Sequence, residues 1–219
     1  MPFFAWSFVE TDRDPALLLK KNDENISKNK FCCFAYSNCD ENFPGVVARK
    51  RFLEIMNKMT GNKVDNLGKC YNTKYKENGT WKNGEELYKP YKFVISFENT
   101  RLKGYVTEKL INPMLARAIP IYFGAPDVDL YFNKKSFIDV NDFPSFEKCI
   151  EHVLKVDNNE KLYREIMDQP YLPENKIDHD LFSIYYGGKF YRDLQQALVP
   201  YGLDRFVRKE KILSELFRT

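Results

Sequence analysis

Apolar residues gather in three nearly uninterrupted segments of an otherwise polar chain. The segments are Phe31–Tyr36, Phe93–Phe97 and Ile119–Phe123, and each is rich in aromatic or β-branched residues. Runs of this kind predict strands that are covered on both faces. Shorter strand candidates lie at residues 64–67 and 136–140.

Between these segments, apolar residues recur at helical spacing. The segment from Val46 to about Met59 is predicted as a helix whose apolar positions are Val47, Phe52, Ile55 and Met59, and Gly61 is expected to end it. Further helices are predicted from Thr107, which can cap its helix, and over residues 146–156 and 161–167. Strands that alternate with helices predict an α/β fold with a parallel sheet.

The predicted alternation covers residues 31–170, with different composition on either side. Residues 1–30 are charged, rich in asparagine and interrupted by proline, which favours a linker or an extended arm. Residues 171–219 are aromatic and basic, and we expect a C-terminal helical extension there, with helices at 190–198 and 209–216.

Composition and charge exclude several classes of protein. The 219-residue chain has a net charge of +3 with mixed signs, too mild to indicate nucleic-acid binding. It has no apolar run of about 18 residues that would span a membrane, and the N-terminus lacks the pattern of a signal peptide. The compartment therefore stays open: cytoplasmic, or Golgi- or membrane-associated for a cropped or atypical protein.

Five cysteines leave an odd one, and their spacing matches neither a zinc site nor a CxxC pair. Cys32 and Cys33 lie in an apolar run, where cysteine is usually a small buried side chain. Reduced thiols, as in a cytosolic protein, are the simplest interpretation.

Polar residues follow the predicted strands directly. Ser37-Asn38, Glu98-Asn99 and Gly124 all come at strand ends, and ligands of parallel sheets bind at the carboxyl ends of the strands. The helix that Thr107 caps carries Lys109 in its first turn. Because a helix N-terminus favours anions, the sequence predicts a phosphate site there.

Other chemistries find little support in the sequence. The GxGxxG fingerprint and the P-loop are absent, and neither His152 nor His179 has a Ser or Cys partner at a recognisable spacing. Asp127-Val-Asp129 could hold a metal on a nucleotide sugar, but it follows Gly-Ala-Pro. We therefore interpret it as a turn with a helix cap at Asp127 and predict no metal site.

A cationic site without a metal is the remaining interpretation. Arg49 and Lys109 can neutralise a diphosphate, and Glu108 can accept hydrogen bonds from sugar hydroxyls. Taken alone, Arg49 is better explained as an exposed residue in the charged run Arg49-Lys50-Arg51.

Four motifs occur in a fixed order: Ser96-Phe-Glu-Asn-Thr100, Tyr105-Val-Thr-Glu-Lys109, Ala118-Ile-Pro-Ile-Tyr-Phe-Gly124 and Ser136-Phe-Ile-x-Val-x-Asp-Phe143. Together they closely resemble the α1,3/α1,4-fucosyltransferases, glycosyltransferase family 10, over residues 31–170. The resemblance implies the C-terminal, Rossmann-like donor-binding domain of the two-domain GT-B architecture. It also implies a metal-independent, inverting transfer of fucose from GDP-fucose to a glycan hydroxyl, such as that of N-acetylglucosamine in α1,3 linkage.

Carried onto this chain, the resemblance implies roles for single residues. Arg49 and Lys109 would contact the diphosphate and stabilise the leaving group, and Glu108 would bind the ribose. The remaining donor ligands would be Asn99 and Tyr105 near the fucose and phosphates, and Ser37 and Asn38 on the nucleotide side. Glu98 would support the site without acting as the base. GDP-fucose is a substrate, and no cofactor is expected.

The chain also departs from the family pattern. Family members have an N-terminal domain that binds the acceptor and supplies the general base, and no residue here matches that base. We expect the donor half of an enzyme, with a separate acceptor-binding domain or chain as a partner. The alternatives are a GDP-sugar-binding module without transfer activity, or a related glycosyltransferase with a different nucleotide sugar.

Overall fold

The structure, a computed structural model, describes residues 8, 13–19, 28–71 and 84–182. The helices predicted at 190–198 and 209–216 lie outside the described residues, as does most of the segment predicted as an arm.

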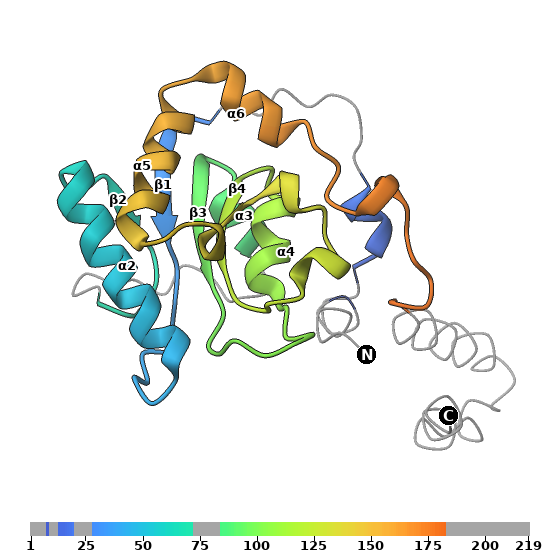
Figure 1. The fold of residues 1–219 in the computed structure, drawn as a ribbon, viewed down its shortest axis with the longest axis horizontal. Coiled ribbons are helices and arrows are strands. Elements are labelled where there is room, and N and C mark those ends of the chain that lie inside the picture. The colour runs from blue at the N-terminus through green and yellow to red at the C-terminus, as the bar shows by residue number, and fades with distance from the viewer. Residues whose placement is uncertain (1–7, 9–12, 20–27, 72–83, 183–219) are drawn as a thin grey trace, which may run out of the picture.

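A five-stranded parallel sheet forms the centre of the described chain, with the strand order β2-β1-β3-β4-β5 (Figure 1). Phe93 lies opposite Cys32 on one side and Ile119 on the other, so the three apolar runs are neighbours. The predicted parallel α/β fold is therefore confirmed. The strands are β1 (Lys30–Phe34), β2 (Val64–Asn66), β3 (Tyr91–Phe97), β4 (Ile119–Phe123) and β5 (Ile138–Asp139).

The helices begin and end largely at the signals expected from the sequence. Thr107 caps α4 by accepting a hydrogen bond from the backbone nitrogen of Lys109, and Gly61 ends α2 in the left-handed conformation. The α-helices are α2 (Pro44–Thr60), α3 (Gly84–Tyr88), α4 (Glu108–Leu115), α5 (Phe146–Asp157) and α6 (Glu160–Met167). Short 3-10 turns lie at Pro15–Leu18, Val128–Leu130, Lys134–Ser136, Val140–Asp142 and Pro173–Asn175.

The two faces of the sheet are covered by different helices (Figure 1). Helices α2, α5 and α6 pack on one face, where Phe52 of α2 meets Phe97 of β3 and Phe146 of α5. Helix α4 packs on the other face, where Leu110 and Met114 lie in one apolar cluster with Tyr122 of β4. Both faces of the central strands are thus buried, as their continuous apolar runs predict.

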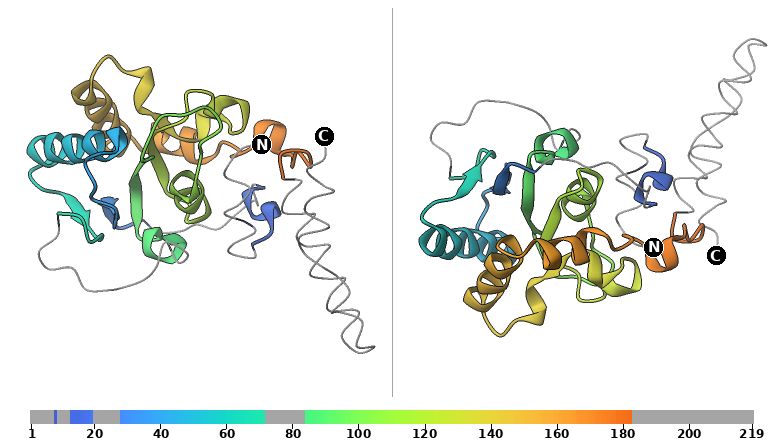
Figure 2. Two further views of the ribbon diagram at one scale, coloured as in Figure 1. Left: turned by 90° about the horizontal axis from the view of Figure 1, so that it is seen from below. Right: turned by 90° about the horizontal axis from the view of Figure 1, so that it is seen from above.

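The two outer segments of the described chain meet beside α4. Phe8 and Leu18 are fully buried, and the rings of Phe8 and Phe182 lie 5.5 Å apart in an edge-on arrangement. Figure 2 shows residues 13–19 next to the segment after α6 in both views. The described part of the segment predicted as an arm therefore packs against the domain.

The predicted buried face of α2 is partly wrong. Val47 is 45% exposed and Met59 is 37% exposed, whereas Arg49 and Met56 have no exposed surface. The inward face contains a charged residue at its centre, and a pattern of apolar residues alone cannot locate such a face.

The expectation of reduced cysteines is also wrong for one pair. Cys39 and Cys70 form a disulfide, with their Cα atoms 5.5 Å apart. These residues follow β1 and β2, which are neighbouring parallel strands, so their loops leave the sheet at the same edge. Cys32, Cys33 and Cys149 are free and buried, as expected for the first two.

Within the described ranges, no helix is long and apolar enough to cross a membrane.

Candidate functional site

The segments that follow β1, β3 and β4 meet at one edge of the sheet, which we call the carboxyl rim. Its centre is the pair Glu98-Asn99 at the end of β3. The backbone nitrogen of Glu98 donates to the carbonyl oxygen of Phe123 at 2.8 Å. A Cβ atom on Gly124 would lie 2.6 Å from Cγ of Glu98, so only glycine permits this approach. The predicted convergence of the strand ends is thus observed.

Arg49 reaches the carboxyl rim from α2. Its Nη1 donates to Oδ1 of Asn99 at 2.8 Å, and its Nη2 donates to the carbonyl oxygen of Asn38. The side chain has no exposed surface, so the interpretation of Arg49 as a solvated member of a charged run is wrong. Its neighbour Arg51 is the exposed residue.

Tyr36 forms the platform beneath Arg49, and the sequence analysis did not identify it. The guanidinium carbon lies 4.1 Å from the centre of the Tyr36 ring, a cation–π geometry. The Tyr36 hydroxyl donates to the carbonyl oxygen of Ile95 at 2.9 Å and accepts from the backbone nitrogen of Phe97 at 2.5 Å. A tyrosine directly before the Ser-Asn pair at a strand end was the available signal.

Burial lowers the pKa of Arg49 below its ordinary value, while Tyr36 and Glu98 oppose the change. The guanidinium nonetheless stays charged at neutral pH. Its Nε is buried and makes no hydrogen bond within the described structure. Arg49 therefore carries a full charge, and its Nε is an unused buried donor.

Glu98 is fully buried below the start of α4. Its Oε1 accepts from the backbone nitrogen of Thr107, and its Oε2 accepts from the Thr107 hydroxyl, both at 2.8 Å. Burial raises the pKa of Glu98 to about 7, against the opposing effects of the Lys109 charge and the hydrogen bonds from Thr107. Glu98 thus ties the end of β3 to the N-terminus of α4.

Lys109 lies over this buried acid. Its Nζ is 3.0 Å from Oε1 of Glu108, 3.1 Å from Oγ1 of Thr107 and 3.6 Å from Oε2 of Glu98. Burial favours the neutral amine, but the two carboxylates outweigh it and raise the pKa of Lys109 above its ordinary value. The charged side chain keeps 18% exposure.

The loop between β3 and α4 is fastened by Asp127. Gly104, which has a positive φ of 70°, donates its backbone N–H to Oδ1 and Oδ2 of Asp127 at 2.9 and 3.1 Å. The next residue, Tyr105, is half-buried, and burial raises its pKa while the charge of Lys109 opposes the change.

Asp127 is the N-cap residue of the 3-10 turn Val128–Leu130, as predicted, but its carboxylate bonds Gly104 instead of the turn. Asp129 of the same Asp-Val-Asp motif is exposed. In the described parts of the chain, no group of three or more His, Cys, Asp or Glu side chains is arranged to hold a metal.

The structure brings together most of the predicted site residues. Arg49 contacts Asn38 and Asn99, while Lys109 contacts Glu108, and Glu98 with its neighbour Asn99 joins the two groups. Ser37 lies in the same loop as Asn38 but is exposed. The disulfide of Cys39 fixes that loop to the segment after β2.

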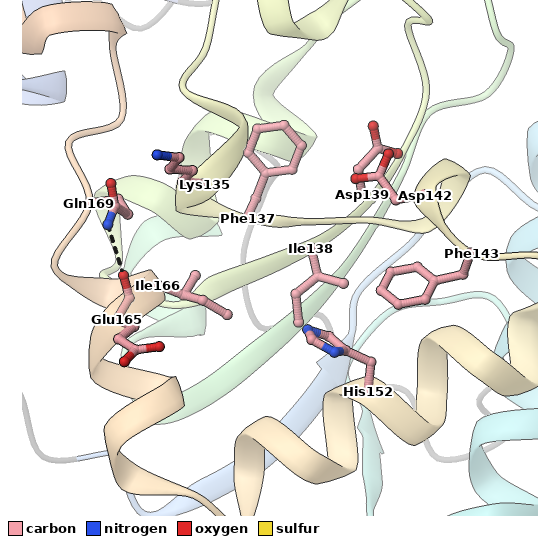
Figure 3. A pocket seen from close by; sticks show the side chains of 10 residues that line it. All are labelled: Lys135, Phe137, Ile138, Asp139, Asp142, Phe143, His152, Glu165, Ile166 and Gln169. Atoms are coloured by element: carbon pink, nitrogen blue, oxygen red, sulfur yellow. Dashed lines mark hydrogen bonds between the residues drawn. The ribbon is translucent and has the colours of Figure 1, made fainter.

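The histidines lie away from these residues. His152 borders a groove of about 350 Å³ between β5, α5 and α6, where its ring lies 5.2 Å from that of Phe143 in a tilted arrangement (Figure 3). Burial, followed by the charge of Lys155, lowers the pKa of His152. His179 is exposed after α6. Neither histidine joins the cationic group at the carboxyl rim.

Residues 25–168 match the model of glycosyltransferase family 10 (fucosyltransferase), C-terminal region. The chain belongs to glycosyltransferase family 10. A protein of Acanthamoeba polyphaga mimivirus, named as a candidate fucosyltransferase, is 38% identical over 161 residues, or 69% of this chain and 26% of the relative. An alpha-(1,3)-fucosyltransferase of Helicobacter pylori is 34% identical over 173 residues, or 76% of this chain and 33% of that enzyme.

A solved fucosyltransferase has a similar fold. The crystal structure of an alpha1,3-fucosyltransferase with GDP-fucose superposes with a TM-score of 0.59 and 30% identity, over 78% of this chain and 44% of the solved one. The chain therefore has the fold of the C-terminal half of a GT-B fucosyltransferase. It spans about a quarter to a third of these curated relatives and less than half of the solved chain.

Proposed function

We propose that this chain is the donor half of an inverting fucosyltransferase. It binds GDP-fucose at the carboxyl rim, and with an acceptor-binding domain or chain it transfers fucose to a hydroxyl of N-acetylglucosamine in α1,3 linkage. Family membership supports fucosyl transfer, and the names of the bacterial relative and of the solved enzyme support the α1,3 linkage.

One observation carries the proposal: two cations are anchored on consecutive residues at the end of β3. Arg49 bonds the side chain of Asn99, and Lys109 is 3.6 Å from the carboxylate of Glu98. The N-terminus of α4, whose first turn contains Lys109, adds the positive end of a helix dipole. A diphosphate fits a site with these three sources of positive charge.

The same cations supply the chemistry of the leaving group. When the bond between fucose and the diphosphate breaks, negative charge builds up on the GDP oxygens. Lys109 and Arg49 stabilise that charge electrostatically and without a metal. The side chain of Lys109 keeps 18% exposure. Arg49 has no exposed surface and its Nη2 bonds the carbonyl oxygen of Asn38, so direct contact with the diphosphate requires that hydrogen bond to be exchanged.

The remaining donor contacts surround these two cations. Glu108, paired with Lys109 at 3.0 Å, binds the ribose hydroxyls. Asn99 and Tyr105 lie on the fucose and phosphate side, while Ser37 and Asn38 lie on the nucleotide side. The general base comes from the acceptor-binding partner, which completes the inverting reaction.

The proposal is tested by paired binding and transfer assays on the 219-residue chain. Calorimetry is expected to show binding of GDP-fucose in preference to GDP-mannose, with little or no transfer to N-acetyllactosamine. Equal affinity for GDP-mannose would indicate a different nucleotide sugar. Robust transfer by this chain alone would overturn its assignment as the donor half, and no binding of either nucleotide would overturn the proposed function.

A further inference from the structure

Glu98 is a buried acid that the proposed reaction does not consume, yet it lies directly beneath the cation proposed to bind the diphosphate. We infer that Glu98 is a positioning residue that orients Lys109 in the empty site and takes up a proton from solvent when the donor diphosphate binds. This inference rests on the proposed function, and it adds a coupling between donor binding and pH.

The geometry makes Glu98 the fixed partner of a movable cation. Both carboxylate oxygens are held by Thr107, through its backbone nitrogen and its hydroxyl, each at 2.8 Å. The carboxylate therefore cannot follow Lys109 if the ammonium turns towards a ligand. The Thr107 hydroxyl accepts from Nζ of Lys109 at 3.1 Å, so Thr107 links the carboxylate of Glu98 to the ammonium of Lys109.

The surroundings of Glu98 contain few positive charges. Two cations face it, Lys109 from α4 and Arg49 from α2, and one further acid, Glu108, lies beside Lys109. The other titratable groups that sense Glu98 are neutral phenols from three different segments, namely Tyr36, Tyr105 and Tyr122. The ionised form of Glu98 thus depends mainly on Lys109.

Binding of the donor weakens the stabilisation that the Lys109 charge gives to ionised Glu98. The two phosphates of a GDP-sugar carry negative charge, attract the Lys109 ammonium and lie near Glu98 themselves. Burial already raises the pKa of Glu98 to about 7, and the loss of its partner raises the pKa further. The carboxylate then gains a proton from solvent and becomes a neutral carboxylic acid, which needs no counter-charge.

The prediction is a proton uptake that can be counted. GDP-fucose is titrated calorimetrically at about pH 8, where Glu98 of the free protein is mostly ionised, in buffers of different ionisation enthalpy. Both phosphates of this ligand are esterified and do not titrate near neutral pH, so any proton taken up enters the protein. We expect most of one proton per site, and an affinity that falls up to about tenfold per pH unit above neutrality.

The variant Glu98→Gln is the matched comparison, because glutamine has the same shape and cannot titrate. We expect it to bind GDP-fucose with no proton uptake and a flat pH dependence. Glu151→Gln, an exposed position on α5, is expected to behave as the wild type. Zero uptake in the wild type, or equal uptake in Glu98→Gln, would overturn the inference while leaving donor binding intact. No binding heat in any protein would overturn the proposed function and, with it, this coupling.

The wild-type measurement stands even if Glu98→Gln fails to fold. In that case Glu98→Asp, which keeps a titrating carboxylate one methylene further from Thr107, is expected to retain proton uptake on binding. Its loss in a folded Glu98→Asp protein would count against the coupling.

Discussion

Nη1 of Arg49 donates a 2.8 Å hydrogen bond to Oδ1 of Asn99, and this bond joins α2 to the end of β3. The backbones of the two elements are also in direct contact, because Gly45 donates its N–H to the carbonyl oxygen of Asn99 at 2.9 Å. A Cβ atom on Gly45 would lie 2.0 Å from the carbonyl oxygen of Glu98. The start of the helix that carries Arg49 is therefore held directly against the end of β3.

Replacing Arg49 by lysine tests whether the two hydrogen bonds of the guanidinium matter in addition to its charge. Lysine keeps the charge but lacks the planar fork that bonds Asn99 and Asn38 together, which leaves a partly buried acceptor without its donor. We expect Arg49→Lys to lower the free energy of unfolding by roughly 1–3 kcal/mol and to weaken GDP binding. Arg51→Lys, an exposed position on the same helix, is the control for urea unfolding and calorimetry. Wild-type affinity in Arg49→Lys would exclude Arg49 from the donor site.

Variants at Asp127 and Asp129 distinguish a role in fastening the loop between β3 and α4 from a role in metal binding. Asparagine at 127 retains one acceptor oxygen for Gly104 instead of two, so we expect Asp127→Asn to lose about 1–2 kcal/mol of stability and to bind GDP more weakly. Asp129→Asn is expected to match the wild type. Thermal unfolding and GDP titration, each with and without a chelator, check both variants. Equal losses in both variants, together with sensitivity to the chelator, would indicate a metal site instead.

The Cys39–Cys70 disulfide restricts the unfolded chain. The two cysteines are 31 residues apart, and a closed loop of that length is expected to contribute roughly 3–4 kcal/mol to stability. The double variant Cys39→Ser/Cys70→Ser should unfold at lower denaturant concentration and should not respond to a reducing agent. An unfolding midpoint of the wild type that a reducing agent leaves unchanged would contradict this prediction.

Glu98 also predicts a pH dependence of stability. Its folded pKa of about 7 lies above the ordinary value of 4.5, so the folded state binds the proton more tightly than the unfolded state. The resulting stabilisation is complete below about pH 4.5 and is lost as the pH rises through 7, up to about 3 kcal/mol. Unfolding of the wild type should therefore show this decline relative to Glu98→Gln. Parallel curves for the two proteins would contradict the raised pKa.

The sequence alone predicts the sheet well, because each central strand contains a nearly uninterrupted apolar run. The capped start of α4 and the convergence of Asn38, Asn99 and Gly124 at one edge follow from the same pattern. These features depend on local spacing and on the general geometry of parallel sheets.

Two features depended on contacts between distant residues. The buried face of α2 was misassigned because Arg49, a charged residue, lies at its centre and is stabilised by Asn99 and Tyr36. The disulfide was missed because Cys39 and Cys70 become neighbours only when β1 pairs with β2. The spacing of residues along the chain could not predict either of these contacts.

The central claim is that the carboxyl rim binds a nucleotide diphosphate through Lys109, and calorimetric titration of GDP into Lys109→Ala tests it most directly. Removing the ammonium deletes a charged contact, so we expect affinity to fall about 10- to 100-fold. Lys161→Ala, at an 87% exposed side chain on α6, is expected to bind GDP as the wild type does. Unchanged affinity in a folded Lys109→Ala protein would contradict the account.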